Sequence, residues 1–244
     1  RETNEERRRD LLTIAKTCNR VPANPASNFK EALQSVWFLH CLVHFEAAGG
    51  GGIVLGRMDQ YLYPFYIKYK EKKGLEETKK WLKSFWINQN QLMLFLPKKT
   101  SMIWSGHPLS EQPTIGGVTE DGKDASNELT KIILEVEKEV GLPRPDITVM
   151  YHNKIDEEVL HKACEALPKA MKPKFFNYDI TFKHLLAKGA TEEDIRKGAV
   201  VIGCVSSGIE GKTWDNNNMA FINYFSISIF PYCNINNLFF QEKI

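Results

Sequence analysis

The sequence predicts an α/β fold, in which strands that pair in parallel alternate with helices. Long stretches carry apolar residues at helical spacing, and short runs rich in β-branched residues fall between them in the second half of the chain. Glycine and proline residues mark the transitions. No repeat, low-complexity linker or interdomain boundary interrupts the pattern, so we expect one large domain or part of a larger one.

The first part of the chain is expected to be helical. Residues 5–18 gather their apolar side chains on one helical face, and two prolines in "RVPANPAS" end this helix. Asn28 followed by Glu31 resembles a capping box, and it opens an apolar helix that the glycines at 49–52 terminate. Residues 75–96 predict a further helix, and an irregular stretch follows it.

The middle of the chain is expected to alternate strands and helices. "TIGG", which begins at Thr114, predicts a strand, and a helix capped near Ser126 follows. "PDITVMYH", residues 145–152, predicts a second strand, and residues 156–171 predict another helix. This order favours parallel pairing, because a helix carries the chain back between strands.

The last part of the chain ends in a segment of a different kind. "FFNYD", residues 175–179, predicts a loop, and residues 179–199 predict two short helices. A β-branched run then leads through Gly203 into Cys204. Residues 225–244 are rich in Asn, Ile and Phe and follow neither the helical nor the strand period. This tail is consistent with a genuine apolar segment or with translation of an out-of-frame, AT-rich region.

Composition narrows the class of protein. The net charge of +2 comes from 32 basic and 30 acidic residues, so no nucleic-acid or membrane-surface partner is expected. Five widely spaced cysteines without a CxxC pair argue against a disulfide framework and a cysteine-zinc site. No secretory signal and no apolar run of membrane-spanning length is evident, so we expect a cytoplasmic protein.

His40 and His44 are spaced as two ligands on one helix face can be. Cys41 follows His40 where an H-E-x-x-H zinc site has glutamate, and the surroundings are apolar. We therefore predict core or interface histidines and no metal site. Arg144, between Pro143 and Pro145, could face a carboxylate ligand, although this segment is better explained as an extended lead-in to a strand.

Cys204 is the strongest single candidate for chemistry. A thiol at the carboxyl end of a strand fits the place where α/β folds collect catalytic groups, although cysteine is also commonly buried for structural reasons. A Cys/His hydrolase would need a base, and the sequence pairs neither His152 nor His184 with the thiol. Phe176 and Asn177 could line a small-molecule pocket or belong to a satellite hydrophobic cluster.

Six stretches taken together resemble the glycyl radical enzymes, the pyruvate formate-lyase-like superfamily. The resemblance covers about residues 5–223, and each stretch is modest alone but stands in the family's order. The stretches are "RVPANPASNFKEALQSVWFLH" (20–40), "LGRMDQYLYPFY" (55–66), "TIGGVTEDGKDASNELT" (114–130), "LPRPDITVMYH" (142–152), "KACEALPKAMKPKFFNYD" (162–179) and "GCVSSGIEGKT" (203–213).

The resemblance implies a fold and a mechanism. The family fold is a barrel of two half-barrels of strands wrapped by helices, of which this chain would hold an incomplete part. A cysteine on an inner hairpin, matched here by Cys204, forms a thiyl radical that takes a hydrogen atom from a small-molecule substrate. A radical S-adenosylmethionine activating enzyme generates the initial radical on a C-terminal glycine, and the resemblance implies a homodimer at full length. No bound cofactor is implied.

Two departures from the family bear on function. Many dehydratases and lyases have a glutamate base where this chain has Ser206, so the resemblance favours C–C bond formation by addition to fumarate, as in alkyl- and arylalkylsuccinate synthases. The alternatives are a dehydratase, decarboxylase or C–C/C–N lyase of the superfamily. Ser206, Ser207, Phe176 and Asn177 are the expected substrate-binding residues.

The second departure is length. No R-V-x-G-[YF]-like glycyl radical motif occurs in the 244 residues, and the resemblance stops near Asn223. We therefore expect a partial pyruvate formate-lyase-like domain over residues 1–224 and an atypical tail over residues 225–244. A fragment of this kind is expected to be inactive alone, and an inactive structural or binding fragment is the alternative from another class.

Overall fold

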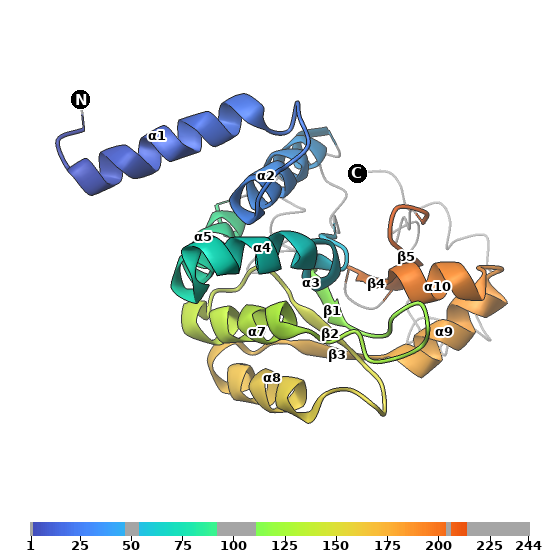
Figure 1. The fold of residues 1–244 in the computed structure, drawn as a ribbon. Helices are drawn as coiled ribbons and strands as arrows, with labels where there is room; N and C mark the ends of the chain where they lie inside the picture. The colour runs from blue at the N-terminus through green and yellow to red at the C-terminus, as the bar shows by residue number, and fades with distance from the viewer. Residues whose placement is uncertain (1, 47–53, 92–110, 204–205, 214–244) are drawn as a thin grey trace, which may run out of the picture.

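The computed structural model describes residues 2–46, 54–91, 111–203 and 206–213. The predicted tail, Cys204 and the glycines at 49–52 lie outside the described residues. Within the described ranges, helices surround a small parallel sheet, and a separate two-stranded hairpin lies beside it (Figure 1). None of the helices in these ranges is long and apolar enough to cross a membrane.

In the described residues before the sheet, the helices are α1 (Glu5–Arg20), α2 (Phe29–Glu46), α3 (Met58–Tyr61), α4 (Tyr63–Lys73) and α5 (Leu75–Gln89). The expected helices over 5–18 and from Asn28 are confirmed, but α5 ends seven residues before the expected residue 96. Asn28 accepts the Glu31 N–H, whereas the Glu31 carboxylate accepts the Ser27 N–H and hydroxyl, so only half of the expected capping box forms.

The apolar face of α1 stays exposed. Helix α1 begins where the Asn4 side chain accepts the N–H groups of Glu6 and Arg7. Leu11 is 45% exposed and Leu12 55% exposed, and Thr17 is the buried residue of the helix. Figure 1 shows α1 extending away from the other helices, which explains why its apolar side chains find no partner within the described ranges.

The sheet has three parallel strands in the order β1 (Thr114–Gly116), β2 (Thr148–Tyr151) and β3 (Lys174–Asn177). Helix α7 (Glu128–Val140) connects β1 to β2, and α8 (Glu157–Ala170) connects β2 to β3. The expected parallel α/β arrangement is confirmed. The expected loop over "FFNYD" is wrong at its start, because Phe175 and Phe176 pair with Val149 and Met150. Pairing with a neighbouring strand, rather than a local period, makes this segment a strand.

The cap of α7 lies one residue later than expected. Asn127, not Ser126, caps the helix, and it forms a reciprocal capping box with Thr130. Gly141 ends the helix in the left-handed conformation that glycine adopts without strain. The internal face of α7 packs Leu129, Ile133 and Leu134, all fully buried, into the main hydrophobic core.

The chain after the sheet forms two short helices and a hairpin. Helices α9 (Tyr178–Ala187) and α10 (Glu192–Gly198) confirm the expected pair. Strand β4 (Ala199–Ile202) then pairs antiparallel with β5 (Ser206–Ile209). A second, smaller core lies under this hairpin and includes Val118, Ile195 and Val201, so the hairpin is packed against the end of the sheet rather than free.

Candidate functional site

The β4–β5 hairpin brackets Cys204, which itself lies outside the described residues. Gly203 and Ser206 are the described residues nearest to it on either side. The hairpin is attached to the sheet, because the Val201 N–H donates to Thr114 Oγ1 at 3.1 Å and Lys174 Nζ lies 3.5 Å from the Gly203 carbonyl oxygen. Two residues of the arm that leads to the thiol, Val201 and Gly203, are therefore held by the first residues of β1 and β3, respectively.

Gly203, the last described residue before Cys204, lies near the amino ends of the parallel strands. Lys174, the first residue of β3, contacts both Gly203 and Asp146 Oδ2, the latter at 2.7 Å. Gln112 Nε2 donates to the same carboxylate oxygen at 3.2 Å. The carboxyl-end rule used for the sequence therefore does not apply, since β4 is not a strand of the parallel sheet. Sequence reasoning missed these three polar residues, which stand at or before strand starts without a motif.

Arg57 joins the hairpin, the sheet and α10. Its Nη1 donates to the carbonyl oxygens of Arg196 and Lys197 at 3.1 and 3.2 Å. Its Nη2 donates to those of Gly116 and Val118 at 2.9 and 3.0 Å, and these two bonds are buried. One guanidinium thus fixes the start of β4 relative to the end of β1, which positions the strand that leads to Cys204.

Gly208 allows the hairpin to close tightly at its other end. A Cβ at this position would lie 2.3 Å from Thr213 Oγ1 and 2.4 Å from Ile202 Cδ1. Thr213 Oγ1 accepts the Ile209 N–H at 2.7 Å and so closes the end of β5. The glycine is needed here for close approach of side chains, not for an unusual backbone angle.

The two serines lie on the hairpin as expected from the sequence. Ser206 pairs with Ile202 and is the first residue of β5, while Ser207 pairs with Val201 and is buried. The side chains of neighbouring strand residues point to opposite faces of the hairpin. Ser206 and Ser207 therefore cannot both face a substrate that binds on one of these faces. Their role toward a substrate stays a prediction.

Phe176 and Asn177 lie at the far end of β3 from Lys174. Phe176 packs against the second hydrophobic core, and Asn177 is exposed, with its side chain accepting the Ile180 N–H at the start of α9. The structure therefore gives both residues a structural contact and does not bring them to the hairpin tip. Their assignment to a substrate pocket stays a prediction.

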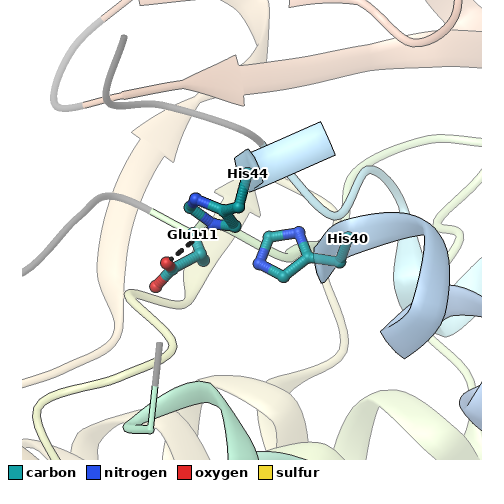
Figure 2. A group of neighbouring side chains, drawn as sticks. All are labelled: His40, His44 and Glu111. Carbon is teal, nitrogen blue, oxygen red and sulfur yellow. Dashed lines mark ion pairs between the residues drawn. The ribbon is translucent and has the colours of Figure 1, made fainter. Parts of the chain in front are cut away.

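His40, His44 and Glu111 are the described residues that could hold a metal ion. Their ligand atoms lie within 4.8 Å of one another, and all three residues are buried (Figure 2). The expectation of buried histidines is confirmed, with His40 4% exposed. Burial, followed by the proximity of His44, lowers the pKa of His40 to about 3. Arg144 Nη1 lies 3.2 Å from Glu111 Oε1, a carboxylate of the chain itself, so a role of Arg144 toward a carboxylate ligand stays a prediction.

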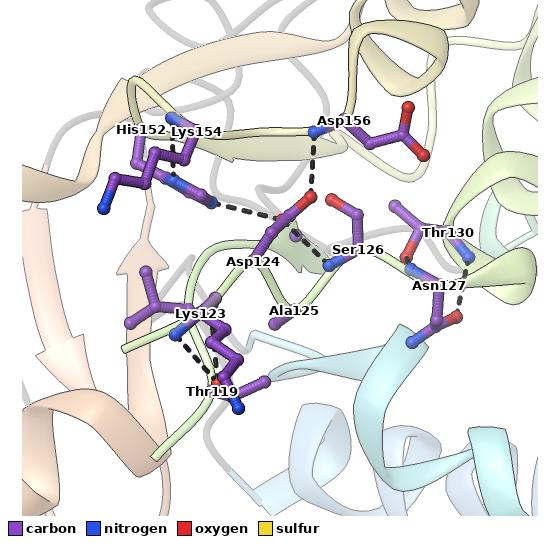
Figure 3. A network of polar contacts seen from close by, with 12 residues as sticks. Thr119, Lys123, Asp124, Ala125, Ser126, Asn127, Thr130, His152, Lys154 and Asp156 are labelled. Atoms are coloured by element: carbon purple, nitrogen blue, oxygen red, sulfur yellow. Dashed lines mark hydrogen bonds and ion pairs between the residues drawn. The ribbon is translucent and has the colours of Figure 1, made fainter. Parts of the chain in front are cut away.

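The His152 side chain belongs to a hydrogen-bond network that follows the carboxyl end of β2 (Figure 3). Its Nδ1 accepts the Lys154 N–H at 3.3 Å, so Nε2 carries the proton that it donates to Asp124 Oδ1 at 3.1 Å. Asp124 Oδ2 also accepts the Asp156 N–H at 2.8 Å. The network ties the segment after β1 to the turn after β2. Both ring nitrogens of His152 are therefore engaged, and His184 is exposed on α9.

Comparison with known proteins gives one consistent family. A family model described as pyruvate formate lyase-like matches residues 1–228. The chain is 33% identical to the isethionate sulfite-lyase of Oleidesulfovibrio alaskensis over 227 residues, which cover 91% of this chain and 27% of that protein. It is 34% identical to the trans-4-hydroxy-L-proline dehydratase of Clostridioides difficile, covering 86% of this chain and 27% of that protein.

Solved structures agree with the sequence relatives. The chain superposes with a TM-score of 0.79 on a glycyl radical enzyme from Archaeoglobus fulgidus, at 32% identity, over 85% of this chain and 27% of that one. A structure concerned with 1,2-propanediol dehydration in Roseburia inulinivorans gives a TM-score of 0.81 at 31% identity, over 86% of this chain and 25% of that one. The chain thus spans about a quarter of the length of these proteins. Since the family model covers most of its residues, the chain belongs to the pyruvate formate lyase-like family of glycyl radical enzymes.

Proposed function

We propose that the chain is the part of a glycyl radical lyase that carries the substrate-activating thiol, Cys204. The observation that carries this proposal is the anchored β4–β5 hairpin, whose strands flank Cys204 in the sequence. Hydrogen-atom transfer needs the sulfur and the substrate carbon in a fixed geometry and away from competing donors. The contacts from Thr114, Lys174 and Arg57 restrain the backbone on the amino-terminal side of the thiol.

The reaction is proposed to begin and end at the Cys204 sulfur. A thiyl radical there takes a hydrogen atom from a substrate carbon, which forms S–H and a carbon radical. A leaving group departs from the neighbouring carbon, and the product radical takes the hydrogen atom back and regenerates the thiyl radical. The hydroxyl group on the radical carbon releases its proton as the leaving group departs with its bonding electron pair, so the net change is the loss of that anion and one proton from the substrate. The initial radical is proposed to arise on a glycine outside these 244 residues, through a radical S-adenosylmethionine activating enzyme.

Elimination is better supported than the expected addition to fumarate. The relatives named above are a sulfite-lyase and a dehydratase, and the first solved structure concerns dehydration. Ser206 cannot take up a proton at neutral pH as a carboxylate does. We therefore propose a leaving group that departs as a weakly basic anion, such as sulfite, because it needs less help from a protein acid or base than hydroxide does.

The test uses the whole protein that contains this chain, activated without oxygen. We expect turnover of isethionate to exceed that of 1,2-propanediol and trans-4-hydroxy-L-proline, and no fumarate consumption. Cys204→Ala should abolish turnover while the glycyl radical remains visible by electron paramagnetic resonance. Cys164→Ala is the matched control, because Cys164 is an exposed cysteine on α8. Turnover retained by Cys204→Ala would contradict the assignment of the thiol, and fumarate consumption would restore the addition reaction.

A further inference from the structure

Two histidines and a glutamate that the proposed chemistry does not use lie together near the amino end of β1. His40 and His44 stand one turn apart on α2, and Glu111 comes from the segment that leads into β1. The two imidazole rings have centroids 4.5 Å apart, and their planes are at 89° to each other. His44 Nε2 is 3.0 Å from Glu111 Oε1. Figure 2 shows the two imidazoles and the carboxylate turned toward one another.

The donor atoms of this cluster are buried without hydrogen-bond partners among the described residues. These atoms are His40 Nε2, His44 Nε2 and Glu111 Oε2. The 3.0 Å approach of His44 to Glu111 is close enough for an ion pair, but no hydrogen bond forms at that nitrogen. A buried polar atom left unpaired costs about 1–3 kcal/mol, and native structures hold few of them. Three such unpaired polar atoms in one cluster indicate a missing partner that all three share.

We propose that His40, His44 and Glu111 bind a divalent transition-metal ion, for which zinc is the best match. Two imidazoles at i and i+4 with one carboxylate form a donor set that zinc prefers, and three protein ligands leave a fourth position for water. The sequence alone indicated no metal here because the third ligand comes from a segment far from α2.

The geometry requires an adjustment of the side chains. In a tetrahedral site, two ligands that each lie about 2.1 Å from zinc are about 3.4 Å apart. The donor atoms here lie within 4.8 Å of one another, so the longest separation must shorten by up to about 1.4 Å. Rotation of the imidazoles about their side-chain bonds can supply this shift.

Arg144 sets the expected strength of the site. Its guanidinium holds Glu111 through Oε1, which leaves Oε2 as the oxygen without a partner. An outer contact of this kind orients a ligating carboxylate. The positive charge of Arg144 also opposes a cation, so we expect weaker binding than at a zinc site with four protein ligands.

The test measures metal binding by the whole protein without substrate or radical activation. We expect one zinc ion per chain by mass spectrometry of the dialysed protein, and a cobalt absorption spectrum typical of tetrahedral or five-coordinate binding. Glu111→Gln and His44→Gln should each weaken zinc binding by at least about 100-fold. His184→Gln is the matched control, since His184 is exposed on α9.

Two outcomes would overturn the proposal. One is an unsubstituted protein that binds neither zinc nor cobalt, and the other is a folded Glu111→Gln protein whose zinc affinity stays within threefold of the original. Circular dichroism identifies a variant that has not folded. If one of Glu111→Gln and His44→Gln fails to fold, the zinc affinity of the other variant tests the proposal. Failure of this proposal leaves the role of Cys204 untouched, because metal binding is measured without turnover.

Discussion

Replacement of Arg57 by methionine should destabilise the fold around the hairpin. Methionine keeps much of the apolar volume but removes the four hydrogen bonds to backbone carbonyls. The bonds to Gly116 and Val118 are buried, and each should contribute about 1.5–2 kcal/mol as a bond from a charged donor. The other two bonds are partly buried, so water can replace them. We expect the free energy of unfolding to fall by about 3–4 kcal/mol.

Urea unfolding followed by tryptophan fluorescence measures this change, and amide hydrogen exchange locates it. We expect the amides of Val201 and Glu210 to lose protection first. The Arg57 side chain holds the residues just before β4, the Glu210 N–H donates to the Gly198 carbonyl at that end of the hairpin, and the Val201 N–H donates from β4 to Thr114. Arg196→Met is the matched control, since Arg196 contributes its carbonyl to Arg57, and its side chain contacts Glu192 as an ion pair and lies over the Phe182 ring, where methionine keeps the apolar contact. If Arg57→Met lowers the free energy of unfolding by less than about 1 kcal/mol, which is the contribution of a surface ion pair, the reasoning is refuted.

Three further predictions concern the same framework. Gly208→Ala should cost about 1–3 kcal/mol in thermal or urea unfolding, because the new Cβ overlaps Thr213; an unchanged midpoint would contradict the close packing. Burial raises the pKa of Asp59, so the folded chain holds the carboxyl proton more tightly than the unfolded chain does. The free energy of unfolding should therefore fall as pH rises from about 3.8 through the raised pKa. Asp59→Asn should remove that part of the slope in a pH series of urea unfolding, and an unaltered slope would count against it. His152→Phe should cost about 1–3 kcal/mol in urea unfolding by removing the imidazole N–H that donates to Asp124 in a partly buried network, whereas the exposed His184→Phe should change stability by less than about 0.5 kcal/mol.

The helices were predictable because their signals are local. Apolar residues at helical spacing, asparagine at helix starts and Gly141 at a helix end all act within a few residues of one another. The errors in the helices are correspondingly small, such as the cap at Asn127 instead of Ser126. The exposed face of α1 could not be foreseen, since a period shows which residues share a face but not what covers it.

The strand β3 shows where local signals are insufficient. "FFNYD" contains no alternation, and its first residues become a strand only because β2 offers a pairing edge. The same limit applies to the direction of the hairpin. Its sequence indicated a strand that ends in a thiol, but the contact with Lys174 places Gly203, the last described residue of that arm, near the amino ends of the sheet.

The sequence by itself determined the α/β class, the family and the candidate thiol, because these follow from motifs and periods within short stretches. Only the tertiary structure decided that Arg57 joins the hairpin to the sheet and that Glu111 meets His40 and His44. Such contacts join residues far apart in the chain, and they depend on how the strand register and the crossover helices place whole segments. No local pattern encodes that placement, because it results from burying the apolar faces of all the elements at once.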